Sequence, residues 1–293
     1  MKSFNIKRFG KTLRWVLSVN FHTMLAWTAG AALATFLGEM AMASMSNYYD
    51  PITMVHQYAL AGVALLLIIA TILACMVVSS IHDKRRRGTF LMLPATNAEK
   101  FLSLIIYSSV VCMLCTFLAL AAGDTLRMVW YWVTGGPREV IEVFDGVRVT
   151  YHWHISAIPK LLENITSIRL GYGISSAIYV IFKYFVLYSF FVWIHSLFTL
   201  GGTLLRKYSF VATTALLILS MVLFFEVLDK FDLDLFNVTW HDGRIEAYHI
   251  GAGYVLAVAL PLLSIFNYWA SYRIFKGFQI ITNKWTNYDI LKR

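Results

Sequence analysis

Six stretches of the chain are apolar for long enough to cross a lipid bilayer as α-helices. A transmembrane helix needs about 20 consecutive, mostly apolar residues, and polar or charged segments separate the six stretches. The predicted spans are about 20–42, 58–80, 98–122, 175–200, 209–228 and 250–272. This pattern predicts a single all-α integral membrane domain with six transmembrane helices, occupying residues 1–293.

The distribution of lysine and arginine predicts the orientation of these spans. The N-terminal segment, the second and fourth loops and the C-terminal tail carry clusters of basic residues. The first loop has none, and the longer third and fifth loops together hold more acids than bases. Because loops rich in lysine and arginine stay in the cytoplasm, we expect both termini to be cytoplasmic in a multi-pass membrane protein.

The composition supports a membrane protein and limits the kinds of partner that we expect. Hydrophobic residues make up 59% of the chain and charged residues 14%, against about 45–50% and about 25% in soluble domains. The net charge of +9 would suggest nucleic acid in a soluble protein. Here the basic residues flank apolar spans, where they set topology and contact lipid headgroups. We therefore expect the lipid bilayer as a partner and no nucleic acid.

The first residues have the pattern of a separate helix that lies in the membrane interface. The apolar positions Phe9, Leu13, Val16 and Leu17 recur at helical spacing, and the basic positions Lys7, Lys11 and Arg14 occupy another face. Trp15 suits the headgroup level, where amphipathic aromatic rings gather. The alternative is a basic flank that only sets topology.

The loop between the second and third spans is patterned. Thr96 and Glu99 have the spacing of a capping box, so the third span should begin there, and Pro94 disfavours helical geometry at the residue before it. What remains is a short basic and apolar segment, 83–93, with Phe90, Leu91 and Leu93 available to a partner. The alternative is that its four consecutive basic residues only mark the cytoplasmic side.

The long outer loop, about 124–174, predicts a small folded cap outside the membrane. Residues 140–153 alternate between apolar and polar around Asp145-Gly146, which is typical of a β-hairpin. Residues 158–170 look like a short amphipathic helix. The fifth loop has a similar but weaker pattern around Asp242-Gly243.

No motif for catalysis or nucleotide binding occurs in the sequence. It contains no G-x-x-x-x-G-K-[ST] phosphate loop, no H-E-x-x-H and no G-x-S-x-G. We therefore expect no catalytic, cofactor or metal-ligating residues in this chain. Its cysteines and the methionines near the first outer loop are expected to serve packing.

Three ionisable residues are candidates for a transport pathway. Lys183 lies two turns inside the fourth span, where a charge costs a few kcal/mol unless it reaches the interface or a polar cavity. Glu39 and Glu226, at the outer ends of the first and fifth spans, are its possible partners. The alternatives are a snorkelling lysine and ordinary interface residues.

The layout resembles the permease subunit of ABC-2 type exporters. The strings LPATNAEKFL at 93–102 and LGGTLLRKYSF at 200–210 are similar to segments of small bacterial ABC-2 permeases. The resemblance implies a bacterial cytoplasmic (inner) membrane location. It also implies a homodimer, or a heterodimer with a similar permease, bound to two separate ABC ATPase subunits that hold ATP-Mg.

The resemblance also implies roles for two segments. The segment 83–93 maps onto the coupling helix that docks into the ATPase, with Asp83, Arg85, Arg86, Arg87, Phe90, Leu91 and Leu93, and 7–17 maps onto the connecting helix. The outer cap is longer than in the family's glycan and lipid exporters, so the substrate class stays open. The alternative from another class is a non-transporting assembly or sensor module that binds a partner through its cap.

Overall fold

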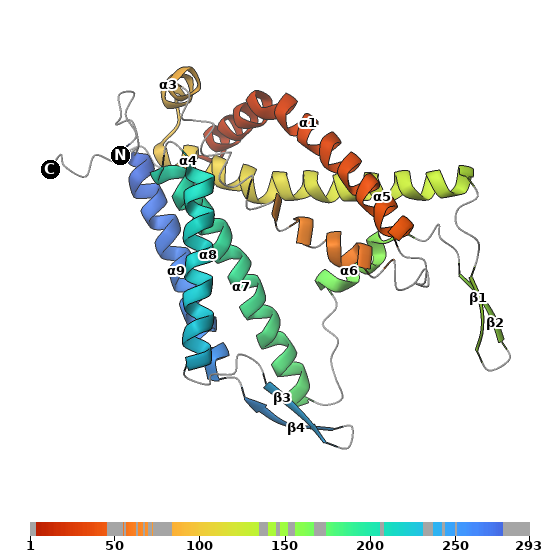
Figure 1. Ribbon diagram of the computed structural model, residues 1–293. Coiled ribbons are helices and arrows are strands. Elements are labelled where there is room, and N and C mark those ends of the chain that lie inside the picture. Colours follow the sequence, from red (N-terminus) through yellow and green to blue (C-terminus); the bar gives the residue numbers. More distant parts are fainter. Residues whose placement is uncertain are drawn as a thin grey trace. The chain divides into compact units, whose positions relative to one another are not determined.

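The computed structural model of the chain is mainly helical (Figure 1). It describes residues 4–45, 84–134, 140–144, 147–151, 156–166, 174–205, 208–230, 237–241, 244–249 and 251–277, together with part of 55–72. The helices are α1 (Ile6–Met45), α3 (Lys84–Met92), α4 (Asn97–Ile106), the π-helix η2 (Tyr107–Val111), α5 (Cys112–Thr134), α6 (Ile158–Thr166), α7 (Ile174–Leu204), α8 (Ser209–Lys230) and α9 (Gly251–Lys276).

Two antiparallel hairpins accompany the helices. Strand β1 (Val140–Phe144) pairs with β2 (Val147–Tyr151), and β3 (Asn237–His241) pairs with β4 (Arg244–His249). The first hairpin lies within the segment 140–153 that has the alternating pattern. In the sequence, Asp145-Gly146 lies between β1 and β2, and Asp242-Gly243 lies between β3 and β4.

Within the part of the chain that the structure describes, five helical segments are long and apolar enough to cross a membrane, as expected for a multi-pass membrane protein. They are Ile6–Ala43, Asn97–Thr134, Tyr184–Leu204, Ser209–Val227 and Gly253–Lys276. Each overlaps one of the six predicted spans. In the region of the remaining span, 58–80, the described apolar helix is the shorter Gln57–Leu66, and most of the rest of that span lies outside the described residues.

The N-terminal helix differs from its prediction, because α1 is one helix of 40 residues with no break after residue 17. The predicted segment 7–17 is thus the start of a longer helix, divided between the two compact units after Trp15, and its position in the membrane interface stays a prediction. At 1.5 Å per residue the helix is about 60 Å long, twice the roughly 30 Å hydrocarbon thickness of a bilayer. The basic residues Lys7, Lys11 and Arg14 are exposed on its first turns and Trp15 is half-buried.

The third predicted span also extends beyond its expected end. Helices α4, η2 and α5 form a continuous stretch from Asn97 to Thr134, so the helix continues into the segment predicted to be the outer cap. The charged Asp124 and Arg127 suggested a loop, but both are buried in α5 and bind each other. Pairing within one helix removes the reason for the helix to end there.

The chain divides into two compact units, which are described separately. The first comprises Met1–Trp15, Thr71–Ser109 and Ile168–Arg293, and the second comprises Val16–Ala70 and Val110–Ser167. In the second unit, α1 and α5 approach closely at a small residue, since a Cβ added to Gly123 would lie 2.7 Å from the Ala32 carbonyl oxygen. Such close contacts at small residues are a usual mode of helix packing in membranes.

In the first unit, α7 and α8 make a still closer contact. A Cβ added to Gly201 of α7 would lie 1.8 Å from Oγ1 and 2.9 Å from Cβ of Thr213 on α8. Thr213 is buried, and its hydroxyl donates a hydrogen bond to the Ser209 carbonyl. The side chain therefore cannot move aside without losing that bond.

Gly201→Ala is expected to destabilise the folded protein by about 1–3 kcal/mol through overpacking at this contact. Gly38→Ala is the matched control, because nothing lies within 4 Å of the added methyl group. Since alanine is favoured over glycine inside a helix, the control should be stabilised by about 0.5–1 kcal/mol. Thermal unfolding of the two purified variants measures both effects, and equal melting temperatures would contradict the close approach.

Candidate functional site

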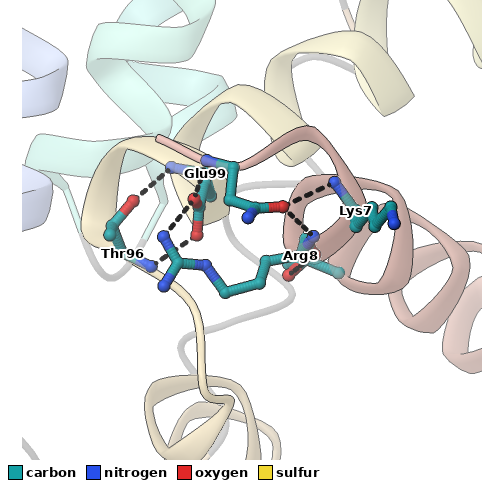
Figure 2. A network of polar contacts seen from close by, with 6 residues as sticks. Lys7, Arg8, Thr96 and Glu99 are labelled. Carbon is teal, nitrogen blue, oxygen red and sulfur yellow. Dashed lines mark hydrogen bonds and ion pairs between the residues drawn. The ribbon is translucent and has the colours of Figure 1, made fainter. Parts of the chain in front are cut away.

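A buried carboxylate joins the start of α4 to the start of α1. The side chain of Glu99 is fully buried and accepts hydrogen bonds from the backbone N–H of Asn5 at 2.7 Å and of Thr96 at 2.8 Å. Arg8 Nη2 lies 3.0 Å from Glu99 Oε1 and forms an ion pair with it. Figure 2 shows Arg8 and Thr96 beside the Glu99 carboxylate. We call Asn5, Arg8, Thr96 and Glu99 the Glu99 network.

The network caps two helices at once. The Glu99 N–H donates to Thr96 Oγ1 at 3.3 Å, which completes the capping box predicted for the start of α4. Asn5 Oδ1 accepts from the backbone N–H groups of Lys7 and Arg8 at 2.9 and 3.3 Å, so Asn5 caps α1. The early N–H groups of Lys7, Arg8 and Glu99, which have no partner within their helices, are thereby bound to side chains.

A second polar contact attaches α3 to α4. Lys100 Nζ donates to the backbone carbonyl of Leu91 at 2.6 Å, and the Lys100 side chain is buried. Leu91 lies in the last turn of α3, where carbonyl groups have no partner within the helix and attract cations. The end of α3 is therefore bound to the first turn of α4.

An aromatic cluster holds α3 from another side. The Phe90 ring lies 5.6 Å from that of Trp15 and 6.2 Å from that of Phe275, and only 1% of Phe90 is exposed. Phe101 lies 5.5 Å from Phe275 and extends the cluster to α4. The segment predicted to serve as a coupling helix is thus packed against α1, α4 and α9.

The structure corrects part of the predicted docking surface. The expectation that Phe90 is available to a partner is wrong, because its ring fills the aromatic cluster. Leu91 and Leu93 are half-buried, whereas Met92, which the sequence did not single out, is 81% exposed. Asp83 lies outside the described residues; Arg85, Arg86 and Arg87 belong to α3, but their side chains are not described.

A buried charge cluster lies in the second unit. Arg127 is 1% exposed; its Nε lies 2.9 Å from Glu39 Oε2, and its Nη2 lies 2.5 Å from Asp124 Oδ1. The second Asp124 oxygen accepts from Ser156 Oγ at 2.6 Å and from the Ala157 N–H at 3.0 Å. The cluster therefore joins α1 and α5 to the residues just before α6.

Aromatic rings complete the surroundings of this arginine. The Arg127 guanidinium lies 5.0 Å from the ring centre of Tyr58 and 6.0 Å from that of Tyr131. These cation–π contacts are strengthened where water is excluded. The acidic and basic side chains of the cluster bind one another, which is typical of a structural role.

The predicted pathway residues are not brought together by any contact of the described residues. Glu39 pairs with Arg127, so it is not an isolated interface residue. The side chain of Lys183 is not described, and Glu226 is exposed on α8. Sequence reasoning missed Arg127 because it was assigned to a loop; the available signal was its i, i+3 spacing from Asp124 within a continuing apolar pattern.

A third polar group joins helices of the first unit. His195 Nδ1 lies 2.7 Å from the Tyr268 hydroxyl, and His195 Nε2 lies 3.3 Å from the Ser108 hydroxyl in the π-helix η2. On the same helices, Asn267 Nδ2 donates to Ser196 Oγ at 3.1 Å. Both ring nitrogens of His195 are thus engaged by hydroxyl groups, which suits interhelical hydrogen bonding.

Among the described residues, no group of three or more His, Cys, Asp or Glu side chains is arranged to hold a metal ion. Comparison of the chain with known protein families, curated proteins and solved structures found no match. Inferences about function therefore rest on the chain's own residues and on the resemblance of its layout and local strings.

Proposed function

We propose that this protein is the membrane-spanning permease subunit of an ABC-2 type exporter, with its termini on the cytoplasmic side of a bacterial inner membrane. The observation that supports the proposal best is the set of contacts that α3 makes with its neighbouring helices. It is a short basic helix between the second and third predicted spans, attached by buried contacts to α1, α4 and α9. A loop that served only as a topology signal would need none of these contacts.

The contacts of α3 suit a part that transmits motion. Displacement of α3 would act on α4 through Lys100 and on α1 and α9 through Phe90. Because a buried polar network costs energy when its bonds are broken, such parts move together. Rigid-body motion of helices is a common way to alternate access between two faces of a membrane.

The energy would come from partner subunits. The sequence contains no phosphate loop, so ATP-Mg is expected in two separate ABC ATPase subunits. Met92, with Leu91 and Leu93 beside it, offers the apolar part of a docking surface next to the four basic residues that begin α3. A second permease copy, identical or similar, would complete the translocation pathway.

Met92→Asp is expected to weaken ATPase binding about thirtyfold, because a buried apolar anchor at an interface is worth about 2 kcal/mol or more. Binding is measured by co-purification and titration of the ATPase subunit encoded beside this chain. Tyr208→Asp is the matched control: Tyr208 is 61% exposed in the α7–α8 connection, and its φ of 59° is one that aspartate accepts.

Deletion of residues 85–93 separates the proposal from its alternative. An exporter permease loses ATPase association and stimulated ATP turnover when this segment is removed. Association and turnover that survive the deletion, combined with loss of function on removal of residues 140–153, would instead favour a non-transporting module that acts through its hairpin.

A further inference from the structure

A cavity of about 550 Å³ lies between α7, α8 and α9 in the first unit, within the size range of ligand sites of roughly 300–1,000 Å³. Helix α7 packs against both α8 and α9 (Figure 1). The cavity walls are largely aromatic and aliphatic: Phe190 and Trp193 from α7, Phe224 and Phe225 from α8, and Ala259 and Leu260 from α9.

Two N–H or O–H groups belong to the described side chains of the lining, the Ser220 hydroxyl and the Trp193 indole. The Ser220 hydroxyl donates to the Leu217 carbonyl at 2.8 Å. A ligand that needs several hydrogen bonds would lose those it makes with water and find few replacements here. The lining therefore selects a hydrocarbon group.

A hollow along α8 adjoins the cavity and brings charge to it. The hollow shares Met221 and Phe225 with the cavity and is also lined by Glu226 and Asp229. Both carboxylates are exposed, and among the described residues neither forms an ion pair. Their i, i+3 spacing places them on the helix face that carries Met221 and Phe225. The apolar cavity therefore continues into a region of negative charge.

We propose that this cavity binds the hydrocarbon tail of a single-chain cationic amphiphile, with its positively charged head beside Glu226 and Asp229. The apolar walls suit a hydrocarbon tail, and the two carboxylates attract a positively charged head. Helix α8 contributes to both parts of the site. Binding is a property of this chain alone. The further step, that such amphiphiles are the exported substrates, rests on the proposed function.

The test uses the full chain in nanodiscs of neutral lipid without ATPase. The probe is an alkyl trimethylammonium ion with a brominated tail, which quenches nearby tryptophan fluorescence. We expect saturable quenching that is largely lost in Trp193→Phe. Tail-matched alkyl sulfate and alkyl maltoside should bind at least about tenfold more weakly than the cation, since both lack the attraction to the carboxylates.

Variants separate tail binding from head binding. Ala259→Phe fills the cavity, so we expect the affinity for the probe to fall at least about tenfold. Ala259→Leu fills the cavity only partly and should lower the affinity by a smaller factor. Val258→Phe is the matched control, because Val258 is 62% exposed. This variant should bind the probe with the affinity of the original chain. Glu226→Gln with Asp229→Asn should remove the preference for the cation without changing maltoside binding.

Two results would overturn the proposal. One is unchanged affinity in both Ala259 variants, which would place the probe elsewhere, and the other is alkyl sulfate binding as tightly as the cation. Either can occur while α3 still binds an ATPase, so failure of this inference and failure of the proposed function are distinguishable.

Discussion

Replacing Arg127 with methionine is expected to lower the free energy of unfolding by about 3–5 kcal/mol, the usual cost of leaving a buried charge without its partner. Glu39 and Asp124 are both buried, and each binds the guanidinium directly. Without it, two carboxylates would share an apolar environment. Denaturant unfolding in detergent micelles, followed by circular dichroism, measures the loss.

Two further variants show whether the loss comes from the charge cluster. Arg273→Met is the matched control: Arg273 is exposed on α9 and contacts the Trp269 ring, so it should cost well under 1 kcal/mol. Glu39→Met added to Arg127→Met removes one of the stranded carboxylates and should recover part of the stability. Equal losses for Arg127→Met and Arg273→Met would contradict the structural role assigned to the cluster.

Replacing Glu99 with alanine is expected to reduce substrate-stimulated ATP turnover of the assembled transporter by about tenfold or more, within the usual range of coupling effects. The change leaves the Asn5 and Thr96 N–H groups and Arg8 without their shared acceptor. The starts of α1 and α4 then lose this shared carboxylate, so these two helices, which α3 contacts through Phe90 and Lys100, move together less closely.

The readouts separate coupling from folding and assembly. Glu99→Gln keeps one acceptor oxygen and the size of the side chain. Its stimulated ATP turnover should therefore lie between that of Glu99→Ala and that of the original chain. Lys11→Gln is the control, because Lys11 is exposed on the same stretch of α1. If Glu99→Ala binds the ATPase normally and keeps full stimulated turnover, the Glu99 network has no part in coupling.

Features that depend on neighbouring residues in the chain could be predicted from the sequence. Five predicted spans overlap helices long enough to cross a membrane, because continuous apolar composition is a local property. The capping box of Thr96 and Glu99 was also predictable, since its two partners lie three residues apart. The boundaries were less accurate where a charge was buried: the pairing of Asp124 with Arg127 allowed α5 to continue to Thr134.

The partners of buried groups were decided by the tertiary structure. Glu39 and Arg127 lie 88 residues apart, and His195 and Tyr268 lie 73 apart, so no local pattern joins them. In a membrane protein, lipid-facing and protein-facing side chains are similarly apolar. Hydrophobicity alone therefore does not separate buried Phe90 from exposed Met92, two residues further along α3, or show that α7, α8 and α9 line a common cavity. The sequence by itself determined where helices form and begin; packing determined which of their faces meet.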